Sequence, residues 1–285
     1  MFMKKFIVAW LLAFATVIPA FADEIPDSVF DADPYFLLMG EADAAIADKN
    51  WPEAAARLCD ALAVKPNHPS NALLFNNLAS VYSRMGEDSL AVATYGRGLE
   101  IAPNMLTLVI GRGKTYLALG RDKEAYGDFC HAVEIDSIAA DARFYRGMMA
   151  LYSGNLATAE ADFKVLNAVA PKSIDNAVAM STLYSLTNRE RQAIPYLEKL
   201  IENEPAAEYY ATLAGCRLAL GELTEASEVI SAGLKRYPRD PELYYYRAWL
   251  NRDRFRNDDA RADGARAIEL GANPQKVKEL LAAKH

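Results

Sequence analysis

The chain has 285 residues, of which 52% are hydrophobic, and its formal net charge is −7. This acidic balance disfavours non-specific binding to nucleic acids and to anionic membrane surfaces, because both need clustered positive charge. The three cysteines, Cys59, Cys130 and Cys216, are an odd number, which excludes a complete disulfide framework. Each falls within a helical pattern, so we expect buried small hydrophobic side chains.

The segment 1–22 has the pattern of a secretory signal peptide. Two lysines precede an apolar run from residue 6 to 18, and Ala20-Phe21-Ala22 is a cleavage site of the A-x-A type. The run is short for a membrane span, although an uncleaved anchor is the alternative. We expect cleavage after Ala22, which predicts a periplasmic or secreted protein with a short acidic lead-in at residues 23–33.

Residues 72–105 predict two short amphipathic helices joined by a tight turn. Apolar residues in each half recur with the 3.6-residue period of one helix face. Gly86 ends the first helix, and Pro103 ends the second because it cannot donate a backbone hydrogen bond. Ala91 and Gly98 are small enough to let the two helices approach closely. Neither helix is long enough to be stable alone, so the pair must pack against neighbouring pairs.

This unit resembles the tetratricopeptide repeat, whose pattern W-x2-L-G-x2-Y, then A-x3-F and a closing P, spans about 34 residues. The residues that match are Phe75, Leu78, Ala79, Tyr82, Ala91, Tyr95 and Pro103. The resemblance implies an all-α, right-handed superhelix (an α-solenoid) built from stacked helix pairs. It also implies a non-catalytic protein that binds other proteins, and together with the signal-peptide pattern it indicates a protein of the exported bacterial type.

The helix-ending residues recur on the same period along the chain. Gly86, Gly120 and Gly154 are equally spaced, and the interval between Pro171 and Pro205 is the same. The solenoid is expected to cover residues 34–285, with seven repeats near 35–68, 72–105, 106–139, 140–173, 174–206, 207–240 and 241–274 and a capping helix at 275–284. A polar-backed terminal helix is what an open stack needs to cover its last apolar face.

Two residues of the seventh repeat depart from the family pattern. Asn251 and Gly264 stand where larger apolar residues are usual. The repeat still has Tyr244, Ala248 and Ala260 at the expected places, so we include it in the solenoid.

Local signals at the helix ends agree with this division. Asp33 and Asp240 each precede a proline, the arrangement of a capping acceptor before the first helical residue. Asn50 with Glu53 could form a capping box. Pro195 falls inside a second helix, where we expect a kink.

No motif in the sequence predicts catalysis, a cofactor or a metal. The stretch from Gly111 to Thr115 contains Gly-Lys-Thr but lacks the upstream glycine of a phosphate-binding loop. The histidines His68, His131 and His285 are not at metal-ligand spacing. An enzyme of unknown chemistry is the alternative, and a cluster of side chains with strongly shifted pKa values would favour it.

The resemblance places the partner-binding surface on the first helix of each repeat, which lines the concave groove in this family. The residues expected in that groove are Asn76, Ser80, Arg84, Lys114, Phe144, Met148, Tyr152, Thr182, Tyr245, Trp249 and Arg252. Packing between adjacent repeats is the alternative role for the aromatic ones.

The expected function is a non-catalytic scaffold or adaptor in the bacterial cell envelope that binds a protein or peptide partner in this groove. Nucleic-acid binding is not expected, nor is stable membrane insertion after cleavage. A self-assembling structural subunit is a further alternative.

Overall fold

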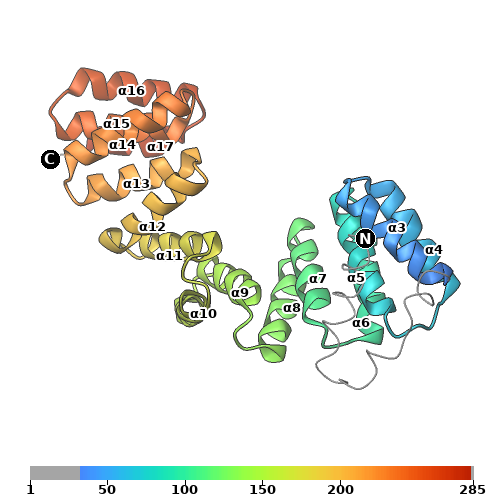
Figure 1. Cartoon of the computed structure of the whole chain (residues 1–285). Coiled ribbons are helices and arrows are strands. Elements are labelled where there is room, and N and C mark those ends of the chain that lie inside the picture. Colours follow the sequence, from blue (N-terminus) through green and yellow to red (C-terminus); the bar gives the residue numbers. More distant parts are fainter. Residues whose placement is uncertain (1–32, 284–285) are drawn as a thin grey trace. The chain divides into compact units, whose positions relative to one another are not determined.

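The computed structural model describes residues 33–283, and within that range every regular element is an α-helix. The fifteen helices form seven consecutive pairs followed by one last helix (Figure 1). The all-α repeat architecture predicted from the sequence is confirmed, whereas the signal peptide and most of the lead-in lie outside the described residues.

The helices are α3 (Pro34–Ala47), α4 (Trp51–Val64), α5 (Asn71–Arg84), α6 (Asp88–Ile101), α7 (Leu106–Ala118), α8 (Asp122–Ile135), α9 (Ala140–Tyr152), α10 (Leu156–Val169), α11 (Ile174–Leu186), α12 (Glu190–Asn203), α13 (Ala207–Ala219), α14 (Leu223–Arg236), α15 (Pro241–Asp253), α16 (Asn257–Glu269) and α17 (Pro274–Ala282).

The chain divides into two compact units between Ala142 and Arg143, a point inside α9. The first unit contains α3 to α8 and the start of α9, and the second contains the rest of α9 and α10 to α17. Each unit has its own packed helix pairs, so each is described by itself below.

The turn inside each helix pair passes through one residue in the left-handed backbone region. The prediction that Gly86 ends a helix is confirmed, because its φ is +79°. Non-glycine residues at such positions carry strain that only Asn and Asp tolerate readily. The seven turn residues are Lys49, Gly86, Gly120, Gly154, Asn188, Gly221 and Phe255.

The helix ends follow the sequence signals with one exception. The side chains of Asp33 and Asp240 accept hydrogen bonds from the backbone N–H groups of Tyr35 and Leu243, as predicted. The capping box at Asn50 is wrong: its side chain makes no capping bond, and the nearby Glu53 carboxylate instead accepts a hydrogen bond from Arg57.

The core of the second repeat forms where α5 and α6 approach each other through small residues. Ala91 is fully buried and packs in one cluster with Ala79, Tyr95 and Leu108. The placement predicted for Ala91 is therefore confirmed.

Ala91→Arg should lower the free energy of unfolding by about 3 kcal/mol, because it forces a long charged side chain into this cluster. Thermal melting followed by circular dichroism would measure the loss. Ala93→Arg is the matched control, since Ala93 lies on the exposed face of the same helix. Equal melting temperatures for the two variants would contradict the packing described here.

An ion pair joins the two helices of several repeats at a constant separation of 16 residues. Arg on the first helix donates two hydrogen bonds to Asp on the second, and the Asp is buried each time. In the first repeat the charges are exchanged, with Arg57 Nε 3.3 Å from the carboxylate of Glu41. The three pairs of the first kind are Arg112–Asp128, Arg146–Asp162 and Arg247–Asp263. The arginines occupy the position where the second repeat has Leu78.

The two departures in the seventh repeat have local explanations. The Asn251 amide donates a 2.9 Å hydrogen bond to Asp263 and so joins the ion pair of that repeat. Gly264 makes room for α17, whose Val277 lies directly over it. The last helix therefore belongs to the packed structure of the seventh repeat, as a cap would.

Candidate partner-binding face

The first unit presents three of the predicted groove residues along one face of α5. Asn76 is half-buried and donates to the side chain of Asn77, whereas Ser80 and Arg84 are exposed. Residues four apart on a helix share a face, so these three lie in a row. On α7, Lys114 donates a 2.6 Å hydrogen bond to Asp141, so an ion pair partly neutralises its charge.

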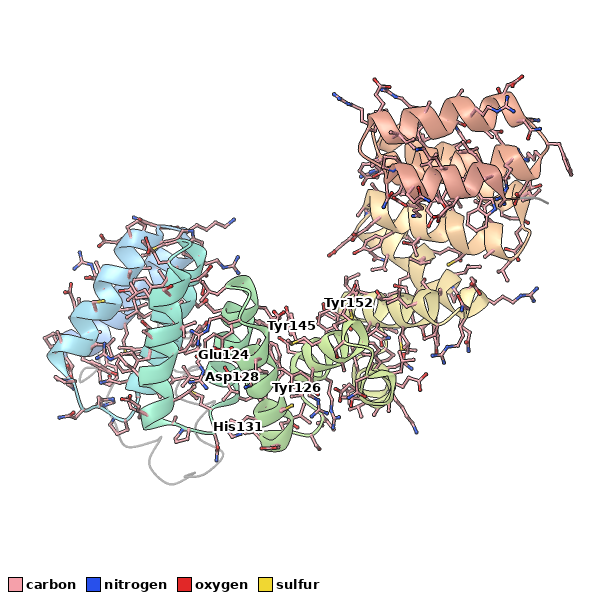
Figure 2. The ribbon with its side chains drawn as sticks, turned by 180° about the vertical axis from the view of Figure 1, so that it is seen from behind. Glu124, Tyr126, Asp128, His131, Tyr145 and Tyr152 are labelled. Carbon is pink, nitrogen blue, oxygen red and sulfur yellow. The ribbon has the colours of Figure 1, made fainter. Side chains whose placement is uncertain are left out.

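The second unit exposes an apolar side chain at the end of α9. Tyr152 is 71% exposed, and Phe144 and Met148 on the same helix are half-buried. Tyr145 and Tyr152 lie two turns apart along α9 (Figure 2). Thr182 on α11 uses its hydroxyl locally, donating a 2.7 Å hydrogen bond to the carbonyl of Val178.

Leu186 is a residue of this face that the sequence analysis missed. It ends α11 as Tyr152 ends α9, it stands one repeat later in the chain, and it is 58% exposed. The repeat period alone could have found it, because the same helix position one repeat on from Tyr152 is again apolar. Exposed apolar side chains that recur on consecutive repeats are unlike the scattered single ones found on most surfaces.

The structure places Tyr245 under the last helix, which differs from the expectation that it faces the groove. Its side chain is 8% exposed and belongs to a core cluster with Ala248, Val277 and Leu280. Packing was the alternative role for the aromatic residues expected in the groove, and Tyr245 has that role here. The seventh repeat therefore uses Tyr245 for packing.

Trp249 and Arg252 are held by neighbours within the same unit. Trp249 stacks on Tyr246 with ring centroids 6.2 Å apart, and its indole N–H donates to Asp253. Arg252 donates to Asp253 and to the carbonyl of Leu280 in α17. These contacts fix both side chains in the fold of the last repeat.

The cysteines differ in their environments, and the described residues hold them as free thiols. Cys216 is buried, which raises the pKa of its thiol. The expectation of burial is wrong for Cys59, which is exposed with its Sγ 3.7 Å from the hydroxyl of Tyr82. Cys130 is intermediate.

Most of the shifted pKa values in the described part belong to packed tyrosines and ion-paired groups, and burial also raises the pKa of Asp43 and lowers that of His68. Burial raises the pKa of Tyr35 and of Tyr246 to about 12. The hydroxyl of Tyr35 donates to Asn71, whose amide in turn donates to two backbone carbonyls of the preceding loop. Such shifts follow from burial, which disfavours the ionised form of the phenol. Between residues 33 and 283, no three His, Cys, Asp or Glu side chains gather as metal ligands would.

Two segments of the chain match family models. Residues 72–105 and residues 217–276 each match a model described as a tetratricopeptide repeat. DnaJ homolog subfamily C member 3 of Rattus norvegicus and of Homo sapiens is 24% identical in an alignment of 183 residues, and the match covers 56% of this chain. The match spans 36% of the length of those relatives.

Solved structures with the same fold cover most of this chain. A tetratricopeptide repeat protein from Parabacteroides merdae has a TM-score of 0.62 and 22% identity, covering 87% of this chain and 97% of that one. PilW, described as a type IV pilus biogenesis factor, has a TM-score of 0.62 and 20% identity over 73% of this chain and 96% of its own. PilF of Pseudomonas aeruginosa has a TM-score of 0.62 and 16% identity, covering 75% and 97%. At these identities the likeness shows the fold. None of the described helices has the length and apolar character to cross a membrane.

Proposed function

We propose that this tetratricopeptide-repeat protein is a non-catalytic scaffold of the bacterial cell envelope that holds a protein segment against the first helices of its repeats. Repeat proteins of this kind offer extended surfaces rather than enclosed sites, and such surfaces suit extended segments or single helices. The acidic balance of the chain directs the proposal to protein partners rather than nucleic acid.

The observation that carries the proposal is the exposed apolar pair formed by Tyr152 and Leu186. Both end a first helix, in consecutive repeats of the second unit, and both leave more than half of the side chain exposed. Exposure of large apolar side chains costs solubility and contributes nothing to the core. Tyrosine is also enriched among the residues that dominate binding energy at protein interfaces.

Replacing both residues with alanine should weaken partner binding by about 2 kcal/mol or more while leaving the melting temperature nearly unchanged. A photoreactive amino acid at position 152 of the exported protein would first identify the partner, and calorimetry would then measure the affinity of both forms. Leu156→Ala/Val169→Ala is the control, because these residues are also exposed apolar side chains, although less so, and lie on the second helix α10. Equal loss in both double variants, or no loss in either, would place the binding surface elsewhere.

The envelope location rests on the amino-terminal pattern of Lys4, Lys5, the apolar run and the A-x-A site. Export with cleavage after Ala22 should give a mature protein whose first residue is Asp23. Edman sequencing of the protein from a periplasmic extract would read that residue. Recovery of the full-length chain from the membrane fraction would instead support the uncleaved anchor.

A further inference from the structure

The second helix of the last repeat lacks a large side chain that every earlier repeat has. At the corresponding place the other six second helices carry a buried aromatic or large aliphatic residue, whereas the seventh has Gly264. The six residues are Leu58, Tyr95, Phe129, Phe163, Leu197 and Ile230. The seventh repeat would therefore have a hollow at this place if nothing else filled it.

The last helix fills that hollow. An added Cβ at Gly264 would lie 2.9 Å from Cγ1 of Val277 and 3.1 Å from Cδ1 of Leu281. Val277 and Leu280 are buried, and they contact the cluster that contains Tyr245 and Ala248. We call the surface on α15 and α16 around Gly264 the socket, and α17 the plug.

Polar contacts define which kind of helix the socket accepts. The ammonium of Lys276 lies 4.2 Å from the ring centroid of Tyr245 and 2.8 Å from the carboxylate of Glu242. Arg252 donates a 3.0 Å hydrogen bond to the carbonyl of Leu280, a group near the end of α17 that has no partner within the helix. The socket thus recognises a short helix with a lysine next to its first apolar residue and a free carbonyl end.

The plug has the features of an exchangeable element. It has nine residues, too few for a stable helix in isolation, and it is attached through the short connection 270–273, in which Gly271 has φ +112°. The geometry points to a socket that takes α17 from a second copy of this chain, so that two chains exchange their terminal helices. This inference does not rest on the proposed function.

The exchange costs little, because every contact made within one chain is also made between two chains. The plug binds the socket of its own chain more readily than that of a second chain only because it is attached to it. The short linker gives the plug an effective concentration of ~mM at its own socket. The unmodified chain should therefore be monomeric at micromolar concentration and should form dimers as the concentration approaches that range.

Two complementary variants test the inference with the full mature chain. Val277→Asp/Leu281→Asp destroys the plug and leaves the socket empty, whereas Gly264→Phe restores the missing side chain, fills the socket and frees an intact plug. Each variant alone should be monomeric by light scattering. Their mixture should form a 1:1 complex, which native mass spectrometry distinguishes from either homodimer when one variant is isotopically labelled.

The triple variant, which has neither a plug nor an open socket, is the matched control and should not bind either parent. Circular dichroism verifies that each chain is folded, and Gly264→Leu replaces Gly264→Phe if the larger side chain prevents folding. A mixture of folded variants that stays monomeric at concentrations up to the millimolar range would overturn the inference. So would an equal amount of complex with the triple variant, because association would then use another surface.

Discussion

Asp162→Ala should lower the free energy of unfolding by about 3–5 kcal/mol, because it leaves two arginines without their shared carboxylate in a largely buried site. Asp162 is 0% exposed and accepts hydrogen bonds of 2.6 Å from Arg143 Nη1 and of 2.8 and 2.7 Å from Arg146. The guanidinium groups cannot lose their charge, so the part of their desolvation cost that Asp162 offsets would remain. Urea denaturation of the protein would measure the change.

The reversed pair of the first repeat supplies the control. Glu41 and Arg57 are considerably more exposed, so Glu41→Ala should cost no more than about 1 kcal/mol. If Asp162→Ala is equally mild, the buried ion pair does not stabilise the second unit as described.

The chain also provides its own apolar replacement for such a pair. At the equivalent positions the fifth repeat has Met180 and Tyr196, whose separation along the chain equals that of the ion pairs. Asp128→Ala alone should be strongly destabilising, whereas Arg112→Met/Asp128→Tyr should recover most of the loss, because a packed apolar pair is often as stable as a buried ion pair. No recovery in the double variant would mean that the third repeat cannot accommodate the packing of the fifth.

Gly147→Ala should also lower the free energy of unfolding strongly, by about 2–3 kcal/mol, even though it adds only one methyl group. That methyl would lie 2.5 Å from Cε1 of Phe163 and 3.1 Å from Cβ of Asp162. Phe163 is completely buried and has no room to move away. The contact therefore has to be relieved by separating α9 from α10.

Gly127→Ala is the matched control and should have the opposite sign. Gly127 lies on the exposed side of α8, with nothing within 4 Å of the added methyl. Alanine in a helix interior is favoured over glycine by about 0.5–1 kcal/mol, so this variant should be slightly more stable than the parent. Denaturation curves of both variants measured side by side would show the difference, and a stabilising Gly147→Ala would contradict the close approach of the two helices.

The sequence predicted the helix pairs well because their signals are local. Turn glycines such as Gly86 and cap residues such as Asp33 act within a few residues of chain, and their period revealed the repeat. The capping box at Asn50 failed because Glu53 had a better partner one turn further on, in Arg57.

The candidate face was harder to predict, because exposure depends on what covers a residue. Tyr152 and Tyr245 are both aromatic residues on first helices, yet one is exposed and the other is covered by α17. The arginines of the buried ion pairs were missed for a similar reason. Arg146 stands where the repeat pattern has leucine. An arginine is accommodated there because it pairs with the carboxylate of Asp162, 16 residues later in the chain.

The fixed separation of Arg and Asp has a consequence for how the chain avoids misfolding. A protein made of similar units can pair the first helix of one repeat with the second helix of another during folding. Pairing the first helix of the first repeat with the second helix of the third would place Glu41 against Asp128, two like charges. Pairing the first helix of the third repeat with the second helix of the fifth would place Arg112 against Tyr196, which offers no carboxylate. Wrong pairings of this kind are therefore penalised before the stack is complete, whereas a mismatch among the third, fourth and seventh repeats is not, because these repeats share the same Arg–Asp pair.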